Sequence, residues 1–319
     1  METRRIGSLS VSLAGLGCNN FGGRLDQAAT YEVVDAALDA GVTFFDTADI
    51  YGGTRSEEYL GRALAGRRDR VVIATKFGHE IDAERRGARP EYVRRAAEDS
   101  LRRLGTDRLD LYQLHRPDPG VPVADTLGAL DELVRAGKVV EIGCSNFSTE
   151  QLREAQEAVR PGSARFVSVQ NQYSLLHREP ESGVLAECER ARLAFRPYFP
   201  LASGLLTGKY RKGRPPPPGS RIQASERYAG LLSEPNLDVV ERLIAFAESR
   251  GRTLLELACS WLASRTVVAS VIAGATSPAH VRANAGAVGW RLTPEEMRAV
   301  DAITTPGGRP SAERSLEPA

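Results

Sequence analysis

Lysine is nearly absent from this sequence of 319 residues, although basic residues are common. It occurs only at positions 76, 138, 209 and 212, and arginine supplies every other basic side chain. A lysine inside an apolar stretch therefore needs a specific explanation. Lys76 is such a case, because it directly follows the run Val71–Thr75, which has the pattern of a buried strand.

Long apolar runs and a large net charge are also missing. No stretch approaches the roughly 18 apolar residues of a transmembrane helix, and the arginine-containing N-terminus lacks the apolar segment of a signal peptide. The net charge of +1 gives no field that would attract nucleic acid or an anionic membrane. We therefore expect a cytoplasmic protein, a monomer or weak homo-oligomer, that acts on a small molecule without nucleic-acid or membrane partners.

Cysteine is sparse and scattered. Cys18, Cys144, Cys188 and Cys259 lie far apart, with no Cys-x-x-Cys motif and no histidine at metal-ligand spacing. The sequence therefore predicts reduced, buried thiols and no metal site.

What is present is a regular alternation of strand-like and helix-like segments. A β-hairpin is expected within residues 4–13, ahead of the main fold, where it could cover one end. The predicted strands are Leu13–Gly17, Thr43–Asp46, Val71–Lys76, Leu109–His115, Val140–Ser145, Phe166–Gln170, Leu193–Tyr198 and Ser270–Gly274. The predicted helices are Gln27–Ala40, Glu57–Ala65, Pro90–Leu104, Ala124–Ala136, Thr149–Val159, Gly183–Arg190, Leu237–Arg250 and Leu254–Arg265.

Eight strand–helix units predict an α/β fold, a (β/α)8 TIM barrel with an N-terminal β-hairpin and a long loop after strand seven. An open doubly wound sheet is the alternative, but no G-x-G-x-x-G motif follows the first strand. We expect residues 1–303 to form a single barrel domain and residues 304–319 to form a partly disordered tail. The polar, proline-rich segment Tyr210–Ser233 is expected to be a long, mobile loop.

Polar side chains stand at the ends of nearly all the predicted strands. Because a parallel barrel brings the carboxyl ends of its strands to one face, these groups should meet there. Chance placement of polar residues where strands run into solvent could explain any one of them but explains the whole set poorly. The set is Asp46, Lys76, His115, Asn146, Gln170, Tyr198 and Gly274.

The stretch FFDTADIYGG, residues 44–53, places a carboxylate and a phenol just beyond a buried strand. Asp46 can neutralise the buried Lys76, and Tyr51 and His115 can complete an acid–base cluster with them. Each member also has a plain structural interpretation: a rim ion pair for Asp46 and Lys76, loop packing for Tyr51, and a hydrogen-bonded core position for His115. Asp49 has no role beyond shaping the turn.

With these motifs in place, the sequence resembles the aldo-keto reductases over roughly Thr3 to Ile303. Asp46, Tyr51, Lys76 and His115 stand at the family's catalytic positions, in the contexts FFDTADIYG, VVIATKFG and LDLYQLHR. Further matching motifs are GCSNF at 143–147, VQNQY at 169–173, PLASGLLTGKY at 200–210 and GATSP at 274–278.

The resemblance implies reduction of an aldehyde or ketone by NADP(H), bound without a Rossmann fold, with NAD(H) not excluded. By similarity, Tyr51 would donate the proton, Lys76 held by Asp46 would lower the tyrosine pKa, and His115 would orient the carbonyl oxygen. Ser145, Asn146 and Gln170 would hold the nicotinamide carboxamide, and Tyr198 would stack on the ring. The remaining cofactor contacts implied are Leu201, Ser203, Gly204, Lys209, Arg221, Gly274, Thr276, His280 and Asn284.

The phosphate end of this implied site has one independent argument and several departures from the family. Ser277 and Pro278 are typical of a helix N-terminus just past strand eight, where barrels favour phosphate. However, Gly274 and His280 stand where many relatives carry a lysine or arginine toward the 2′-phosphate, and Ala283 replaces a common glutamate. The choice between NADP and NAD therefore stays open. Phe199 also replaces a common serine.

Two other functions remain as alternatives. One is a cofactor-binding, redox-sensing regulatory subunit resembling potassium-channel β subunits. The other is an isomerase or aldolase with Lys76 as a Schiff-base nucleophile. The sequence does not identify the substrate, because the aromatic residues near the rim could either line a substrate pocket or pack in the core. These residues are Phe21, Phe77, Phe147 and Tyr173.

Overall fold

The structure is a computed structural model that describes residues 1–304. Ten strands are assigned, of which the first two form a separate antiparallel hairpin. The hairpin strands are β1 (Thr3–Ile6) and β2 (Leu9–Ser12). The others are β3 (Ala14–Gly17), β4 (Phe44–Asp46), β5 (Val72–Phe77), β6 (Leu109–Leu114), β7 (Val139–Ser145), β8 (Phe166–Gln172), β9 (Ala194–Tyr198) and β10 (Val271–Gly274).

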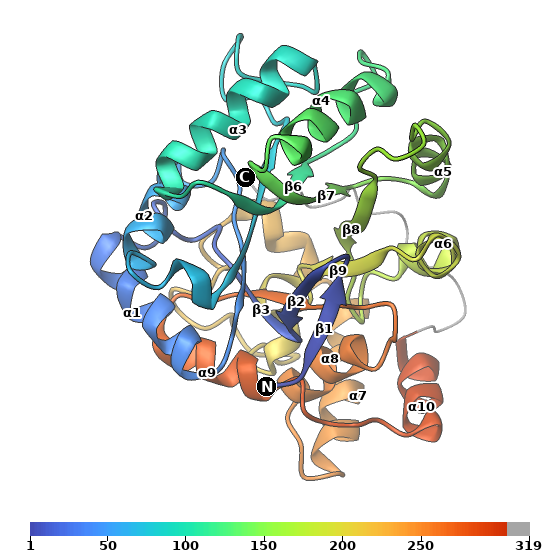
Figure 1. The fold of residues 1–319 in the computed structure, drawn as a ribbon. Helices are drawn as coiled ribbons and strands as arrows, with labels where there is room; N and C mark the ends of the chain where they lie inside the picture. Colours follow the sequence, from blue (N-terminus) through green and yellow to red (C-terminus); the bar gives the residue numbers. More distant parts are fainter. Residues whose placement is uncertain (305–319) are drawn as a thin grey trace.

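The eight remaining strands are parallel and follow one another in the order β10-β3-β4-β5-β6-β7-β8-β9. The two edges of this sheet meet through a parallel bridge between Phe195 of β9 and Val268, just ahead of β10. The chain therefore forms the predicted (β/α)8 barrel (Figure 1). The alternative of an open doubly wound sheet is wrong.

Helices surround the barrel, and Figure 1 shows α1 to α6 following one another around it. Their bounds are α1 (Gln27–Asp39), α2 (Arg55–Ala63), α3 (Pro90–Leu104), α4 (Val123–Arg135), α5 (Thr149–Glu157), α6 (Val184–Ala191), α7 (Glu234–Glu248), α8 (Leu254–Ala263), α9 (Pro278–Gly286) and α10 (Pro294–Thr304). Short 3₁₀ segments are η1 (Arg68–Arg70), η2 (Glu179–Ser182), η3 (Ala202–Thr207) and η4 (Glu226–Leu232).

Local signals explain where several helices begin and end. Helix α3 begins with Pro90 at its first turn and ends at Gly105, whose φ of 62° is the left-handed conformation that glycine adopts readily. Helix α8 begins with a capping box in which Thr253 and Glu256 satisfy each other's backbone N–H groups. None of the helices within residues 1–304 is both long and apolar enough to cross a membrane.

The hairpin covers the end of the barrel opposite the carboxyl ends of the strands. Ile6 and Val11 are fully buried against the inward-facing residues Phe44, Ala74 and Leu111. Figure 1 shows β1 and β2 in front of the barrel strands. The expected role of the hairpin as a cover is therefore confirmed, and it seals an apolar layer at the bottom of the barrel.

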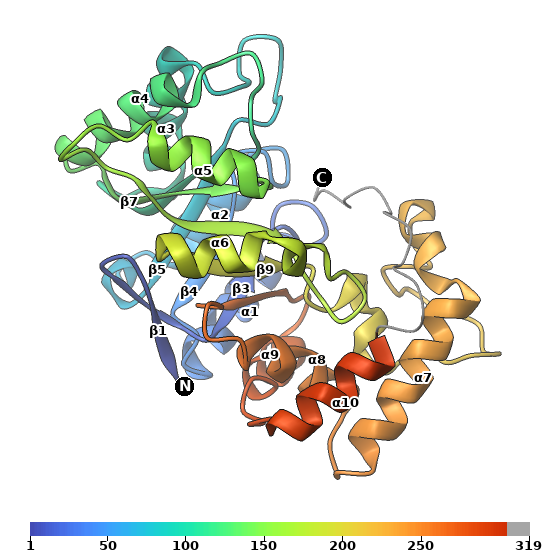
Figure 2. The same cartoon turned by 90° about the vertical axis from the view of Figure 1, so that its right-hand side faces the viewer.

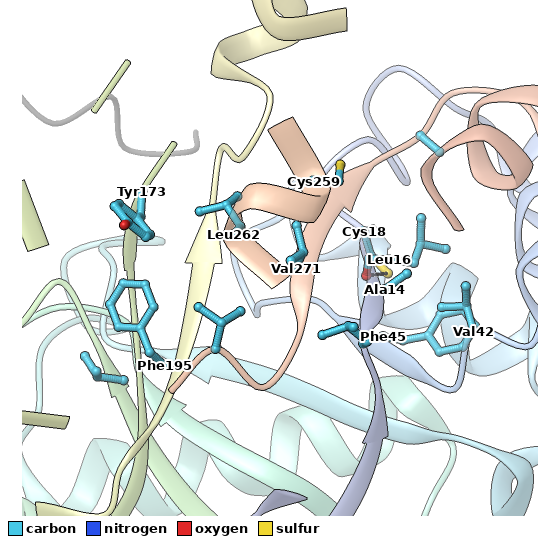
Figure 3. Packing of buried hydrophobic residues seen from close by; sticks show 14 of the residues in the cluster. Ala14, Leu16, Cys18, Val42, Phe45, Tyr173, Phe195, Cys259, Leu262 and Val271 are labelled. Atoms are coloured by element: carbon cyan, nitrogen blue, oxygen red, sulfur yellow. Dashed lines mark hydrogen bonds between the residues drawn. The ribbon is translucent and has the colours of Figure 1, made fainter. Parts of the chain in front are cut away.

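A second, larger core lies between the outer face of the barrel and the helices. Figure 3 shows part of it, with Phe45 beside Val42 in one region and Phe195 below Tyr173 in another. The Tyr173 and Phe195 rings lie edge to face with centroids 5.8 Å apart. Because alternate strand residues point to opposite faces, Phe45 and Phe195 face the helices while their neighbours face the barrel interior.

Two segments differ from expectation. The loop Tyr210–Ser233 contains the 3₁₀ segment η4, and its side chains Tyr210, Ile222, Tyr228 and Leu231 are buried. These apolar groups anchor it to the barrel. Helix α10 was not expected from the sequence, yet Thr293 and Glu296 form a capping box at its start.

Helix α10 packs against α7 (Figure 2). Its last residue is Thr304, which is also the first residue of the expected disordered tail. The rest of that tail, residues 305–319, lies outside the described residues.

Candidate active site

A polar layer lies above the apolar layer inside the barrel. On β4, β5, β6 and β9, Asp46, Lys76, Gln113 and Arg196 each stand two positions after an inward-facing apolar residue. Gln170 on β8 is in register with Arg196. The same alternation that builds the apolar core therefore delivers five polar side chains to the interior at the carboxyl ends of the strands.

Lys76, Asp46 and Tyr51 are in direct contact. The ammonium Nζ of Lys76 lies 2.5 Å from Asp46 Oδ1, and it also donates to the Thr47 carbonyl at 2.8 Å and to the Tyr51 hydroxyl at 3.4 Å. All three side chains are buried, with Lys76 1% exposed. The expected ion pair is confirmed, and the ammonium joins the carboxylate to the phenol.

His115 completes the group that we call the rim cluster: Asp46, Tyr51, Lys76 and His115. Its ring lies edge to face with Tyr51, with centroids 5.8 Å apart. The His79 ring approaches it from another side at 4.2 Å. His115 Nδ1 is buried without a hydrogen-bond partner among the described residues, so the interpretation as a hydrogen-bonded core histidine does not hold for this atom.

Burial dominates the titration of this cluster. Desolvation lowers the pKa of Lys76 and the Asp46 charge partly restores it. Burial also lowers the pKa of His115, helped by the Lys76 charge, and favours a neutral imidazole. Burial raises the pKa of Tyr51, and Asp46 adds to that shift. The resemblance implies a lowered tyrosine pKa, but in the protein alone the net shift is upward, because burial penalises the phenolate.

A cleft runs from the rim cluster along the carboxyl ends of β9, β10 and β3. Asp46 and Tyr51 stand at its inner end. Most of the predicted cofactor residues line it, namely Gln170, Tyr198, Leu201, Ser203, Gly204, Lys209, Arg221, Gly274, Thr276, His280 and Asn284. The barrel thus gathers residues from the ends of five strands, β3, β4, β8, β9 and β10, and from the long loop into one channel.

Ser145 and Asn146 do not line the cleft but lie directly beside it. The Tyr198 hydroxyl donates to Asn146 Oδ1 at 2.8 Å, and Asn146 Nδ2 donates to the His115 carbonyl at 3.0 Å. The Ser145 hydroxyl donates to the Gln170 carbonyl at 2.7 Å. Gln170 Nε2 donates to Asp46 Oδ2 at 2.9 Å. Gln170 is therefore tied to the rim cluster as well as to the cleft.

The turn after β9 has unusual backbone geometry. Phe199, Ala202 and Ser203 have φ values of 49°, 45° and 56°, which side chains other than glycine seldom adopt. Such strain persists only where the surrounding structure enforces it, and it clusters at ligand sites. Phe199 also has a packing role, because its ring lies 5.6 Å from the Arg221 guanidinium. The aromatic replacement at this position thus holds Arg221 over the cleft.

The outer end of the cleft is cationic and suits phosphate groups. Arg24, Lys209, Arg221 and His280 line it, and Asp46 is the one acid among the lining residues described. Helix α9 starts here with the expected cap, the Ser277 side chain accepting from the His280 N–H at 3.3 Å. Ser203 Oγ is buried without a partner among the described residues. An orphaned hydroxyl, several cations and a helix N-terminus fit a dinucleotide phosphate.

Three functional candidates were missed from the sequence. Arg24 lies in the loop after β3, and only the fold brings it to the cleft near His280, where its charge helps to lower the histidine pKa. His79 reaches His115 although it sits beyond the predicted strand end. Asp49 is buried rather than a simple turn residue, and burial raises its pKa to about 8. The position of His79 three residues after Lys76 was the one available signal.

The rim aromatics belong to the packing and not to the cleft. Phe77 stacks on Tyr112 at 4.7 Å, Phe147 lies against Phe166, and Tyr173 lies against Phe195 and Trp261. Phe21 is fully buried. None of the four is among the residues that line the cleft.

Comparison with known proteins agrees with this geometry. Residues 14–305 match the model of the Aldo/keto reductase family. The chain is 33% identical to "Aldo-keto reductase YhdN" of Bacillus subtilis, with 92% of this chain and 90% of that one covered. It is also 33% identical to "Aldo-keto reductase yakc [NADP(+)]" of Schizosaccharomyces pombe, covering 94% and 90%.

A solved structure is similar as well. It is titled as the glycerol dehydrogenase AKR11B4 from Gluconobacter oxydans, with a TM-score of 0.81, 31% identity and 94% of both chains covered. The names of the curated relatives favour an enzyme over the regulatory-subunit alternative.

Proposed function

Because the chain belongs to the aldo/keto reductase family of oxidoreductases, we propose that it reduces an aldehyde or ketone to an alcohol with a nicotinamide cofactor. One observation carries the proposal: a buried phenol and a buried ammonium, 3.4 Å apart, stand at the inner end of a cleft whose outer end is cationic. This arrangement supports the proposal because a phenol stands at the inner end of a cleft that suits a dinucleotide.

Tyr51 is the proton donor in this proposal. Its raised pKa keeps the phenol protonated at neutral pH, so a proton is available for the oxygen of the reduced carbonyl. Lys76 then stabilises the phenolate that remains, and Asp46 holds Lys76 in position. In this proposal the neutral His115 donates a hydrogen bond to the carbonyl oxygen.

A bound nicotinamide dinucleotide would supply the hydride. The cleft residues and their neighbours Ser145 and Asn146 would hold it. Tyr198 would lie beside the ring, Ser145, Asn146 and Gln170 at the carboxamide, and Ser203, Lys209 and Arg221 at the pyrophosphate. Arg24, Thr276, His280 and the start of α9 bind the far phosphate. This surplus of cations favours NADP(H) over NAD(H), as the name of the fission-yeast relative also suggests.

The decisive test is Tyr51→Phe, with Tyr31→Phe on the exposed face of α1 as its matched control. We expect turnover to fall by at least about 10²-fold because the proton donor is lost. The affinity for NADPH, measured by the fluorescence of the bound cofactor, should stay within about twofold. Near-normal carbonyl reduction by Tyr51→Phe would contradict the proposed mechanism.

The substrate panel should contain short aldehydes, sugars and diketones, with glycerol in the oxidative direction because of the solved relative's title. NADPH and NADH are titrated separately. Turnover with none of these substrates, together with no cofactor binding, would contradict the proposed activity. A Schiff base trapped on Lys76 by borohydride would instead support an aldolase.

A further inference from the structure

Arg196 is a fully buried arginine inside the barrel, and the proposed mechanism leaves it without a role. It lies on β9 in register with Gln170, and its side chain is 0% exposed. An unpaired guanidinium in such a place would be strongly unfavourable, so its surroundings must compensate for the charge. Its position puts it in the polar layer with Asp46 and Lys76.

The contacts of Arg196 lead to the rim cluster. Its Nη1 lies 3.5 Å from Asp46 Oδ2, and its Nη2 donates to the side-chain oxygen of Gln113. Gln113 and Gln170 in turn donate to the same oxygen of Asp46, at 3.4 and 2.9 Å. Asp46 therefore faces Lys76 through one carboxylate oxygen and Arg196 through the other.

Two cations thus face one carboxylate. Burial lowers the pKa of Arg196 to about 10, which still leaves it charged at neutral pH. The thiol of Cys18, just after β3, and the thiol of Cys144, which faces the outer core from β7, have pKa values raised by burial and stay neutral. The other titratable groups nearby are His115, whose pKa is lowered, Asp49, whose pKa is raised, and the hydroxyl of Tyr198.

The surplus positive charge matches the charge that forms during the reaction. When Tyr51 transfers its proton to the oxygen of the carbonyl that the proposed cofactor's hydride reduces, the O–H bond of the phenol breaks, an O–H bond forms on the alcohol product, and a phenolate remains. Asp46 and the phenolate then balance Lys76 and Arg196 one for one. Without Arg196, the protein's own buried groups would carry a net negative charge after this step, and charge imbalance in a buried site is costly.

We propose that Arg196 is a positioning residue that supplies the second buried cation and so sets the pH range in which Tyr51 exchanges its proton. The inference rests on the proposed function of Tyr51. Arg196 acts through Asp46 and Lys76 and touches no reacting atom. Its charge lowers the free-energy cost of forming the phenolate of Tyr51 in a buried site. This favours alcohol oxidation as well as carbonyl reduction near neutral pH.

The test compares Arg196→Met, which removes the charge, with Arg196→Lys, which keeps it. For each, kcat/KM of reduction and of oxidation is followed from about pH 6 to 11. We expect the break of both profiles to move upward by on the order of one pH unit in Arg196→Met and to stay near wild type in Arg196→Lys. Arg103→Met, which removes a largely buried cation on the other side of β5, should leave the break unchanged.

A second readout does not depend on turnover. Ionisation of Tyr51 is followed by the tyrosinate absorbance difference between each protein and its Tyr51→Phe counterpart, and it should need a higher pH in Arg196→Met. If Arg196→Met does not fold, Arg196→Gln is measured in its place. Equal breaks in the charged and uncharged variants would overturn the inference, because a purely structural arginine would change stability and not the profile. If Tyr51→Phe remains active, the proposed function itself fails.

Discussion

Two buried charge clusters lie on opposite faces of strand β5, and their charge balances are opposite. Inside the barrel, Lys76 and Arg196 face the single carboxylate of Asp46. Outside the barrel, between β5 and helices α2 and α3, Arg103 pairs with Glu57 at 2.7 Å while Asp49 lies nearby. The inner cluster has a surplus cation and the outer cluster has a surplus carboxylate.

The difference follows from what each cluster can reach. The inner one opens onto the cleft, where the phenolate of Tyr51 can balance its charge. In the outer one the carboxylates are shielded from solvent, since Glu57 is fully buried and Asp49 is 1% exposed. Its surplus carboxylate is instead neutralised by taking up a proton, because burial and the Glu57 charge raise the pKa of Asp49 to about 8. The inner face of β5 therefore keeps its surplus positive charge, and it is the face on which the proposed reaction takes place.

The largest effect should come from Lys76→Met in the inner cluster. Removing the ammonium leaves Asp46 facing Arg196 alone and leaves the phenolate of Tyr51 without its direct partner. We expect kcat to fall by roughly 10²- to 10⁴-fold. Lys138→Met, which removes a half-exposed lysine paired with Glu98, is the control and should keep kcat. A loss of less than about tenfold in Lys76→Met would contradict the assignment.

In the outer cluster, Arg103→Met should destabilise the fold and leave the pH profile of turnover alone. Without Arg103, the side chain of the fully buried Glu57 keeps, among the described residues, only the 2.5 Å hydrogen bond from Thr75. Breaking a buried pair in this way costs about 3–5 kcal/mol of unfolding free energy, measurable by urea denaturation. Adding Glu57→Gln should recover part of the loss. If Arg103→Met alone is as stable as wild type, the pair of Arg103 and Glu57 is solvated and not buried.

Asp49→Asn should remove a pH dependence of stability. An acid whose folded pKa is raised binds its proton more tightly in the folded state, so its stabilising effect is complete below the unfolded pKa near 3.8 and lost as pH rises through about 8. The wild type should therefore lose unfolding free energy between about pH 4 and 8, and the variant should lose less. Urea midpoints across that range test this; parallel pH curves would refute it.

The smallest effect on stability is expected at an exposed ion pair. Arg94 and Glu132 form a bidentate pair with distances of 2.7 and 3.0 Å, but both side chains are exposed. Water and salt screen such a pair, so Arg94→Ala should leave the urea midpoint within experimental error. A clear loss that disappears in high salt would mean that exposed pairs matter in this protein, and would weaken the contrast between the two buried clusters.

Much of the fold could be read from local signals. Helix α3 matches its predicted bounds because proline at its start and glycine after its end are themselves the structural causes. Helix α10 carried an equally local signal in Thr293 and Glu296, so it could have been found. By contrast, the anchoring of the loop Tyr210–Ser233 depends on partners elsewhere in the chain and has no local signature.

The site divides along the same line. The sequence determined which residues end the strands, and with the eight-unit alternation this was enough to expect Asp46, Tyr51, Lys76 and His115 at one rim. Only the tertiary structure decided which face of each strand points inward.

Arg196 lies within a correctly predicted strand, yet its place beside Asp46 depends on the stagger of strands around the closed barrel, including the irregularity between Ile142 and Gly143. Similarly, Arg103 meets Glu57 across 46 residues only because α2 and α3 pack side by side. Strand ends are a local property of the chain, whereas the balance of buried charge is a property of the closed barrel.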